Sequence, residues 1–454
     1  MRIKLGMPMT MEEISKACGG RLISNGNTII YSLTTDTRDM AEGDLFIALS
    51  EKLSDVKKHL CEAKKRRAYT MGTGEENTDI LHSDTKSALL ALAEYYCKNL
   101  PIILYKIGIT GSVGKTTTKE FLRVLLSRRY KCHATEGNYN NEIGMPLSIL
   151  SAPRDTEIMI MEMGMNHPGE IKKLSLCLKP NIALITNVGT AHIGNLGSRE
   201  NIAKAKLEIT EGLADGILIV PSNEPLLTVE KPTKSFGLFD KESDYNLVWN
   251  EVGSVSIFKG ENICCKSVFL PEGDHHKHCL AAAVAAALEA GLSPNLLASG
   301  ISSISNVNIR QKVFFLENYY FYTDFYNSSF ESVMAMINLA KNQYSSIKKS
   351  LLLGDVLELG SMCKKIHFSI GEAISPLVFN NLFLYGENSE YIQLGAIKNS
   401  FPKSRIFLNT CISDPHVTAN QIRENCSDKE MIFMKGSRGM RLENILSIFE
   451  GRNQ

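Results

Sequence analysis

The sequence predicts an α/β protein with three domains. At 454 residues the chain is too long for one ordinary domain of about 150 residues. Short apolar runs alternate with helical patterns from Tyr105 to Pro221, and the same alternation returns after Tyr319. This alternation is typical of parallel sheets covered by helices. Hydrophobic residues make up 44% of the chain and charged residues 22%, which is sufficient to build buried cores.

Residues 1–100 are expected to form a small N-terminal α/β substrate domain. A helix is predicted over Thr10–Cys18, ended by the glycine pair that follows, and short strands are predicted over Thr28–Leu33 and Asp44–Leu49. The basic run Lys57–Arg67 could indicate a polyanion site. Its apolar positions have the spacing of one helix face, which favours a solvated helix instead.

Residues 101–309 are expected to form a central domain on a mostly parallel sheet, with helices on both faces. Strands are predicted at Tyr105–Thr110, Glu157–Met163, Asn181–Val188 and Gly216–Pro221. Helices are predicted from Lys115, near Gly169–Cys177, over Arg199–Leu213 and over the Ala-rich Cys279–Ala290.

Residues 310–454 are expected to form a C-terminal Rossmann-like α/β domain, in which helices separate the strands. A helix is predicted over Ser329–Asn342. The predicted strands are Tyr319–Asp324, Ser350–Gly354, Leu382–Tyr385, Arg405–Leu408 and Glu430–Met434.

Composition excludes several classes of protein. Lysine and arginine number 50 against 49 acidic residues, and the formal net charge of +1 gives no overall field to attract nucleic acid or an anionic membrane. The eleven cysteines contain no Cys-x-x-Cys pair, and no apolar signal region follows the start. No apolar run approaches the roughly 18 residues that span a bilayer. We therefore expect a cytoplasmic protein without nucleic-acid binding or membrane insertion.

The segment Gly108–Lys119 (GITGSVGKTTTK) has the features of a phosphate-binding loop. Its glycines miss the strict spacing by one position, because Ile109 stands where the first glycine is usual. An apolar strand precedes the segment and a helix pattern follows it, so that backbone N–H groups and the helix N-terminus can surround phosphate oxygens. We expect Lys115 to reach the terminal phosphates and Thr116 to ligate Mg²⁺, in a central domain that is P-loop ATPase-like.

Further polar residues are expected at the same edge of the central sheet. Glu162 ends one predicted strand, where its carboxylate can serve Mg²⁺, and His192 follows the next strand. Each residue alone is more often structural, but their convergence with the loop favours a site. In the helix that follows, Lys204 and Lys206 lie on different faces, so only one can face that site. The pattern alone favours the alternative in which both lysines are exposed to solvent.

The run His275–His278 holds three of the ten histidines and could indicate zinc. Zinc usually takes four ligands at regular spacing, and the nearby thiols are Cys264, Cys265 and Cys279, which do not form such a pattern. Zinc is therefore the less favoured interpretation of this cluster.

Several phrases of the sequence closely resemble the Mur ligases. Besides the loop, they include Glu136–Pro146 (EGNYNNEIGMP), Met161–Glu170 (MEMGMNHPGE), Asn187–His192 with Lys204–Lys206, Thr35–Arg38 (TDTR), Gly43–Phe46 (GDLF), Leu353–Gly360 (LGDVLELG) and Lys435–Gly439 (KGSRG). These matches cover all three predicted domains. The greatest likeness is to the family member that adds D-alanyl-D-alanine to UDP-N-acetylmuramoyl-tripeptide.

The resemblance implies an ATP-dependent, ADP-forming peptide ligase of peptidoglycan precursor synthesis. A substrate carboxylate would attack the γ-phosphate, and an amine would then displace phosphate from the acyl phosphate. The residues implied to be catalytic are Lys115, Glu162, His192, Lys206 and Arg310. Those implied to bind Mg²⁺ are Thr116, Glu162, His192 and Lys206, the last as a carbamylated lysine.

Binding residues also follow from the resemblance. Contacts with ATP are implied for Gly111, Ser112, Gly114, Lys115, Thr116, Thr117, Asn138, Asn141, Asp324, Tyr326 and Asn327. Contacts with the UDP-linked precursor or the D-Ala-D-Ala dipeptide are implied for Thr35, Asp36, Thr37, Arg38, Asp55, Asn327 and Ser437.

Three departures from the family leave the substrates open. The segment Ser50–Lys58 keeps Asp55 but lacks the glycine and histidine that usually help to recognise the UDP-linked substrate. His276 and Cys279 replace two asparagines near the expected adenine site. The segment Tyr326–Phe330 reads YNSSF where the family has Tyr-Asn-Ala-Asn-Pro.

Three functions therefore remain. The first is the peptidoglycan ligase just described, expected to be a monomer. The second is the same chemistry on another acid and amine in a specialised pathway, supported by the departures. The third is a nucleotide-binding homologue without turnover, disfavoured because the implied catalytic residues are all present. A generic P-loop kinase or motor is weaker still, because it leaves the third domain unexplained.

Overall fold

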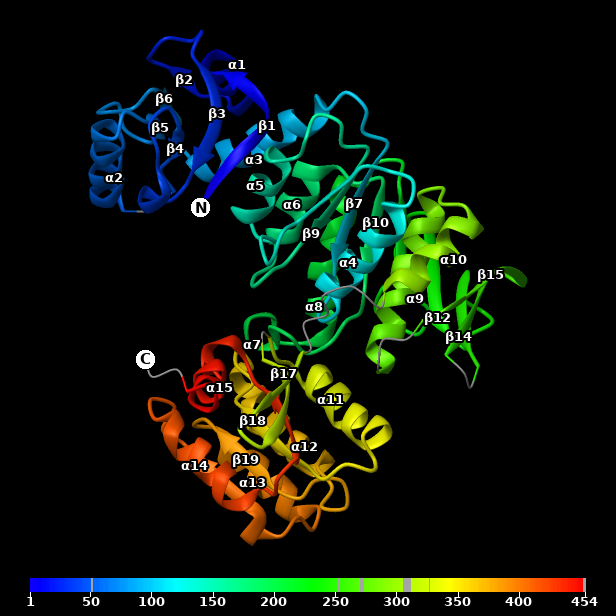
Figure 1. Cartoon of the computed structure of the whole chain (residues 1–454). Coiled ribbons are helices and arrows are strands. Elements are labelled where there is room, and N and C mark those ends of the chain that lie inside the picture. Colours follow the sequence, from blue (N-terminus) through cyan, green and yellow to red (C-terminus); the bar gives the residue numbers. More distant parts are fainter. Residues whose placement is uncertain (50–51, 251–252, 270–272, 305–311, 326, 452–454) are drawn as a thin grey trace.

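The structure is a computed structural model that describes residues 1–49, 52–250, 253–269, 273–304, 312–325 and 327–451. Within them the chain forms three sheets, each built from its own part of the sequence. Figure 1 shows three bodies, with the central one lying between the N-terminal and the C-terminal ones. The predicted α/β class is confirmed.

The first sheet has the strand order β1-β3-β4-β5-β6-β2. Its strands are β1 (Arg2–Thr10), β2 (Arg21–Leu22), β3 (Ile29–Thr34), β4 (Leu45–Ile47), β5 (Tyr69–Gly72) and β6 (Ile80–Leu81). Its helices are α1 (Met11–Cys18), η1 (Thr37–Asp39), α2 (Leu53–Lys65) and α3 (Thr85–Lys98). Thr10 caps α1 in a capping box with Glu13, so the helix begins where the sequence predicted it. Most of the basic run, as far as Lys65, lies in α2. Leu60 and Ala63 of this helix are buried, which confirms the amphipathic helix.

The strand β1 was not predicted from the sequence. It pairs antiparallel with β3, and a register shift between Lys4 and Met9 interrupts its ladder. The interruption explains why no clean alternation of apolar residues marks this strand.

The central sheet has the order β15-β14-β13-β12-β11-β10-β7-β9-β8. Its strands are β7 (Tyr105–Thr110), β8 (Cys132–Ala134), β9 (Ile158–Glu162), β10 (Ile182–Ile185), β11 (Ile217–Pro221), β12 (Thr233–Leu238), β13 (Tyr245–Trp249), β14 (Ser254–Lys259) and β15 (Asn262–Val268). Its helices are α4 (Lys115–Leu126), α5 (Gly144–Leu150), α6 (Glu170–Leu178), α7 (Ile193–Leu196), α8 (Arg199–Leu207), η2 (Glu208–Gly212), α9 (Asp274–Glu289) and α10 (Pro294–Ser303). Neighbouring strands from β8 to β13 are parallel, whereas β14 and β15 are antiparallel additions.

The parallel strands of the central sheet explain its apolar runs. Every residue of β9 and β10 is buried, because helices cover both faces of the sheet. In parallel strands the carboxyl ends share one edge, which is where α4 and the loops after β9 and β10 begin.

The third sheet has the order β16-β17-β21-β18-β19-β20, parallel apart from the edge strand β16. Its strands are β16 (Lys312–Leu316), β17 (Tyr319–Asp324), β18 (Lys349–Gly354), β19 (Leu382–Tyr385), β20 (Ile406–Asn409) and β21 (Met431–Lys435). Its helices are α11 (Phe330–Gln343), η4 (Gly360–Met362), α12 (Cys363–Ala373), α13 (Ser389–Lys398), η5 (Lys403–Arg405), α14 (Pro415–Asn425), η6 (Arg438–Met440) and α15 (Glu443–Phe449). The strands β20-β19-β18-β21 follow the 3-2-1-4 order of a Rossmann-like sheet, and β17 and the antiparallel β16 extend the edge beside β21.

The first body packs directly on the central one. The hydroxyl of Tyr96 in α3 donates a hydrogen bond of 2.7 Å to the carbonyl of Ala152. Gly6 in β1 lies so close that an added Cβ would stand 1.9 Å from the same carbonyl oxygen. This contact requires glycine and fixes the first sheet against the end of α5.

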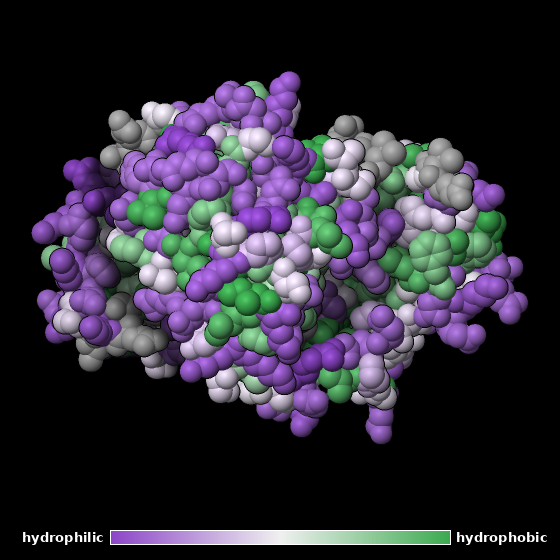
Figure 2. Space-filling view, turned by 90° about the horizontal axis from the view of Figure 1, so that it is seen from below, coloured by the Kyte–Doolittle hydropathy of each residue, from purple (hydrophilic) through white to green (hydrophobic). Residues whose placement is uncertain are grey.

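The surface is mainly polar on the face that Figure 2 shows, where apolar residues form separate small groups. Across the described ranges of the chain, the helices are too short or too polar to cross a bilayer.

Candidate active site

The loop after β7 has the geometry of a phosphate cradle. Gly111 has a φ of +151°, and an added Cβ would stand 1.8 Å from Thr186 Oγ1, so a side chain has no room there. The backbone N–H groups of Ser112 and Val113 donate to Asn187 Oδ1 at 3.1 and 3.0 Å. The loop is thereby tied to the end of β10, and α4 begins with Lys115, as predicted.

A buried carboxylate lies beside the first turn of α4. Glu162, at the end of β9, is 2% exposed. Its Oε2 accepts a hydrogen bond of 2.7 Å from Thr116 Oγ1, and its Oε1 accepts one of 2.7 Å from Asn140 Nδ2. A carboxylate and a hydroxyl next to a phosphate loop are oxygen donors of the kind that Mg²⁺ prefers. The donor set therefore fits a magnesium ion bound together with a phosphate chain.

The two lysines of α8 have opposite environments. Lys204 is exposed, whereas Lys206 is 1% exposed, so only Lys206 is turned into the protein, as the spacing required. Burial, and next the positive charge of Lys115, hold the pKa of Lys206 well below its usual value. A lowered pKa favours the neutral amine, which is the form that reacts with carbon dioxide to give a carbamate.

His192 lies just before α7 with a φ of +63°, an uncommon conformation for a residue other than glycine. Its Nδ1 is 2.6 Å from an Oε2 of Glu358, which belongs to the third sheet's part of the chain. Burial lowers the pKa of His192, and Lys115 and Lys206 lower it further, whereas Glu358 opposes them. The imidazole therefore stands near both lysines.

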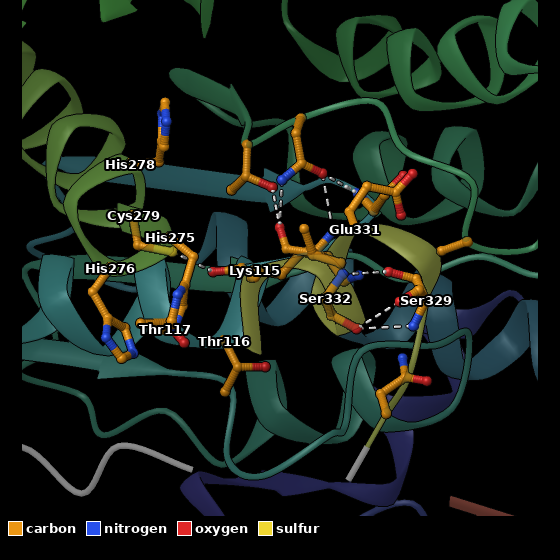
Figure 3. A pocket seen from close by; sticks show the side chains of 18 of the residues that line it. Lys115, Thr116, Thr117, His275, His276, His278, Cys279, Ser329, Glu331 and Ser332 are labelled. Carbon is orange, nitrogen blue, oxygen red and sulfur yellow. Dashed lines mark hydrogen bonds between the residues drawn. The ribbon is translucent and has the colours of Figure 1, made fainter. Parts of the chain in front are cut away.

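A cavity of about 430 Å³ joins the central and C-terminal parts of the molecule. Figure 3 shows Lys115 and Thr116 between the histidines at the start of α9 and the serines at the start of α11. The predicted residues that line it are Ser112, Gly114, Lys115, Thr116, Thr117, Asn138, Glu162, Asp324 and Asn327. Gly111 supports the loop from outside the lining, and neither His192, Lys206 nor Ser437 is part of the lining among the described residues.

Some predicted residues lie elsewhere or outside the described ranges. Asn141 was expected to contact ATP, but its Oδ1 accepts hydrogen bonds from the N–H groups of Ile143 and Gly144 at the start of α5, at 3.1 and 2.8 Å. Its neighbour Asn140 lines the cavity and holds Glu162 instead. Arg310 and Tyr326 lie outside the described residues.

The predicted substrate residues of the first body do not line this cavity. Asp36 Oδ1 accepts from the N–H of Arg38 at 2.9 Å and caps η1, and its Oδ2 pairs with the Arg38 guanidinium at 2.6 Å. The hydrogen bond from Arg38 lowers the pKa of Asp36. Thr35 precedes the capping Asp36, Thr37 is the first residue of η1, and Asp55 lies in the first turn of α2.

The histidines at the start of α9 form one wall of the cavity. The rings of His275 and His276 have centroids 4.0 Å apart. Cys279 lies against the phosphate loop, because an added Cβ at Gly114 would stand 2.9 Å from its Sγ. Burial raises the pKa of Cys279 to about 11, so the thiol is an inert packing group. The described residues contain no group of three His, Cys, Asp or Glu side chains that could hold a metal, so the zinc interpretation has no support.

The start of α11 forms the opposite wall. Ser329 caps α11 in a capping box with Ser332. Serine and asparagine are both preferred at the N-cap, so Ser329 can cap the helix as the family's asparagine would. Ser328 Oγ is buried, lines the cavity and has no hydrogen-bond partner among the described residues. Lys435, 1% exposed, donates to Asp324 Oδ2 at 2.8 Å and to the Asn327 carbonyl at 3.1 Å. Lys435 thus connects the end of β17 with Asn327, which precedes α11.

Ser437, also predicted as a substrate contact, supports a neighbouring loop. Its Oγ accepts from the N–H of Leu357 at 2.9 Å, and its own N–H donates to the Asp355 carbonyl at 3.1 Å. Sequence reasoning assigned no role to Glu331 or Glu358, which contact the loop that carries His192. The one sequence signal near either residue was the motif LGDVLELG, which contains Glu358.

Comparisons with known proteins agree with this arrangement. A family model described as the Mur ligase middle domain matches residues 109–287. The UDP-N-acetylmuramoyl-tripeptide–D-alanyl-D-alanine ligase of Bacillus subtilis is 36% identical, covering 96% of this chain and 97% of the relative. The ligase of the same name from Synechocystis is 33% identical, and the match covers 81% of this chain and 82% of the relative.

Solved structures are similar over almost the whole chain. A crystal structure of MurF from Acinetobacter baumannii superposes with a TM-score of 0.87 at 25% identity and covers 99% of this chain and 100% of that one. MurF from Thermotoga maritima in complex with ADP superposes with a TM-score of 0.78 at 27% identity, covering 92% and 97%. Identity of this extent over all three sheets establishes that the chain belongs to the Mur ligase family and, within it, to the MurF group.

Proposed function

We propose that this protein adds D-alanyl-D-alanine to UDP-N-acetylmuramoyl-tripeptide, with conversion of ATP to ADP and phosphate. The proposal is carried by one observation: the phosphate loop and the buried carboxylate Glu162 line the cavity where the central and third bodies meet, and the charge of Lys115 in that loop acts on the buried amine of Lys206. Relatives of 36% and 33% identity bear the name of this activity.

In the proposed reaction, a carboxylate oxygen of the tripeptide attacks the γ-phosphorus of ATP and ADP leaves. The amine nitrogen of the dipeptide then attacks the acyl carbon and loses a proton, and inorganic phosphate leaves with the oxygen that the carboxylate supplied. Lys115 and the N–H groups at the start of α4 hold the β- and γ-phosphates and offset their charge. Asp324 and Asn327 hold the nucleotide from the third body, with Arg310 and Tyr326 as further proposed contacts.

Thr116, Glu162, His192 and Lys206 are the proposed Mg²⁺ ligands, with Lys206 as its carbamate. Bound Mg²⁺ would supply charge stabilisation to the phosphoryl group that is transferred. The low pKa of Lys206 supports this role, because only the neutral amine takes up carbon dioxide. Carbamylation would turn a buried cation beside Lys115 into an anionic oxygen ligand and so remove a repulsion between like charges.

We further assign residues 1–100 to binding of the UDP-linked precursor, residues 101–309 to ATP and residues 310–454 to the incoming dipeptide. The proposed protein is a cytoplasmic monomer. Closure of the third body over the cavity would keep water from the acyl phosphate.

The same ligase chemistry on another acid and amine is the second candidate. It is favoured by Ser328, whose hydroxyl stands without a partner among the described residues at a position where the family has alanine. An additional hydroxyl in the cavity can change which ligand is accepted.

One assay separates the two candidates. The purified protein is incubated with ATP, Mg²⁺, UDP-N-acetylmuramoyl-tripeptide and D-Ala-D-Ala, and products are followed by mass spectrometry and phosphate release. The pentapeptide product supports the first candidate. Phosphate release that requires a different dipeptide or amino acid supports the second, and binding of ATP without turnover on any substrate pair would refute both.

A further inference from the structure

Two glutamates of the third body contact a single loop of the central body. The loop Val188–Gly194 follows β10 and carries His192. At its start, the N–H of Gly189 donates to Ser112 Oγ at 2.8 Å, which joins the loop to the phosphate cradle. Figure 1 shows α7, which the loop enters, next to the C-terminal body. We call Glu331, Glu358 and this loop the interdomain clasp.

Glu331 binds the first half of the loop. Its Oε1 accepts from the N–H of Thr190 at 2.7 Å, and its Oε2 accepts from Thr190 Oγ1 at 3.2 Å. Gly189 permits this approach, because an added Cβ would stand 2.7 Å from Glu331 Cδ. Glu331 belongs to the first turn of α11, the helix whose start lines the cavity (Figure 3). One carboxylate thus connects the phosphate cradle with the cavity wall of the third body.

Glu358 binds the second half of the loop. Its carboxylate meets His192 Nδ1 at 2.6 Å, and its carbonyl accepts from the N–H of Gly194 at 3.0 Å. Glu358 and His192 both have a φ of +63°, so two strained residues face each other across the interface. Such conformations persist where surrounding contacts enforce them, and here each residue is held by the other body.

The bond to Glu358 determines which nitrogen of His192 is available. A carboxylate only accepts hydrogen bonds, so the hydrogen belongs to His192 Nδ1. The lone pair of the neutral imidazole is then on Nε2. Histidines that bind metal ions commonly donate their other N–H to a carboxylate, which fixes the orientation of the ring.

We propose that Glu331 and Glu358 are positioning residues that make the metal site depend on the docking of the third body. This inference rests on the proposed function in one respect, the role of His192 as a metal ligand. When the third body docks, Glu331 orders the loop and Glu358 orients His192. When it swings away, His192 loses its partner, and the site that activates ATP is incomplete. The clasp therefore couples phosphoryl transfer to the closed state, in which the acyl phosphate is shielded from water.

The test compares Glu358→Ala and Glu331→Ala with the conservative Glu358→Gln and Glu331→Gln. A glutamine keeps an oxygen that can accept from His192 Nδ1 or from Thr190. The control is Glu372→Ala, which removes a third-body glutamate paired at 2.8 Å with Lys398 of the same body. Variants are compared after thermal melting shows that they are folded.

Mn²⁺ binding in the presence of ADP, followed by electron paramagnetic resonance, is the first readout. Loss of a carboxylate that orients a metal-binding histidine typically weakens metal affinity by about 10- to 100-fold, and we expect this for Glu358→Ala. Glu358→Gln should recover most of the affinity, and Glu372→Ala should match the wild type. Affinity for ADP without divalent ions should be the same in all variants. Unchanged Mn²⁺ affinity in Glu358→Ala would overturn the role of Glu358.

Small-angle X-ray scattering of the ligand-free protein is the second readout and needs no activity. The double variant Glu331→Ala, Glu358→Ala should have a larger radius of gyration than the wild type and the control. An unchanged radius would overturn the coupling to docking.

The ligase assay on the same samples keeps the two proposals apart. A wild type that forms no pentapeptide refutes the proposed function, while the Mn²⁺ and scattering results still decide the clasp. A wild type that forms pentapeptide, with alanine variants unchanged in both readouts, refutes the clasp alone.

Discussion

The substitution Gly194→Ala adds a methyl group at a close contact between the central and third bodies. An added Cβ would stand 2.5 Å from the Gly360 nitrogen, 2.6 Å from the Glu358 oxygen and 2.9 Å from the Leu359 carbonyl carbon. All three are backbone atoms of the third body, which cannot turn aside as a side chain can. The methyl group is accommodated only if the two bodies move apart.

The size of the effect follows from that overlap. Ordinary contacts of a methyl carbon begin near 3.4 Å, so the overlap with each atom is about 0.5 to 1 Å, and overpacking of this kind costs about 1–3 kcal/mol. Because the contact is made only when the third body is docked, this cost falls on the closed state. It corresponds to a decrease of about 5- to 150-fold in the closed population relative to the open one.

The assay is kcat/KM for phosphate release together with the radius of gyration from small-angle scattering. We expect kcat/KM to fall within that range, the radius to increase, and the melting temperature to change little. Gly74→Ala is the matched control, since no atom lies within 4 Å of its added Cβ. Gly194→Ala with wild-type kcat/KM and an unchanged radius would show that the docked arrangement is not the one in which catalysis occurs.

Three further predictions concern the cavity and one concerns a distant histidine. Lys115→Ala and Lys206→Ala should each lower turnover by about 100-fold or more, because charge stabilisation of the transferred phosphoryl group is lost; normal turnover in Lys206→Ala would contradict its role as a metal ligand. Removal of dissolved carbon dioxide should inactivate the wild type and added bicarbonate should restore it, as followed by phosphate release. Ser328→Ala should not lower the melting temperature of the ligand-free protein, because a buried hydroxyl without a partner destabilises the folded state. The same substitution should reduce the increase in melting temperature that ADP causes. Burial lowers the pKa of His133 below the usual histidine value of about 6.5, so the unfolded chain binds the proton more readily and the free energy of unfolding should fall as pH drops below about 6.5. Urea melts should show a weaker fall in His133→Gln, and an equal fall would assign the effect to other groups.

Local sequence signals accounted for much of the central and third sheets. The strands β7 and β19 have the predicted bounds, Tyr105–Thr110 and Leu382–Tyr385, because buried parallel strands read as short continuous apolar runs. The spacing of Lys204 and Lys206 predicted only that the two side chains would lie on different faces of the helix. The pattern alone favoured solvent exposure for both, whereas Lys206 is buried.

Contacts between distant parts of the chain could not be predicted from the sequence. The contacts of Glu331 with Thr190 and of Glu358 with His192 join residues 141 and 166 positions apart. Glu358 lies in the family motif LGDVLELG, but no local feature of either glutamate indicates its partner. Asn141 and Asn140 show the same limit on a smaller scale, since only the start of α5 decides which of two adjacent asparagines is used as a cap.

The departures from the family pattern have physical explanations at two positions. Ser329 takes over helix capping, and Cys279 fills the space against Gly114 as an uncharged group. Both changes keep the cavity walls in place, which supports retention of the ligase chemistry rather than its loss.

Transfer of an isotope from substrate to phosphate tests the central claim most directly. The tripeptide precursor is labelled with ¹⁸O in its terminal carboxylate and incubated with ATP, Mg²⁺ and D-Ala-D-Ala, and the released phosphate is analysed by mass spectrometry. If the carboxylate attacks the γ-phosphorus, one ¹⁸O atom appears in inorganic phosphate for each pentapeptide formed. Phosphate without ¹⁸O, or phosphate released without pentapeptide, would contradict the account.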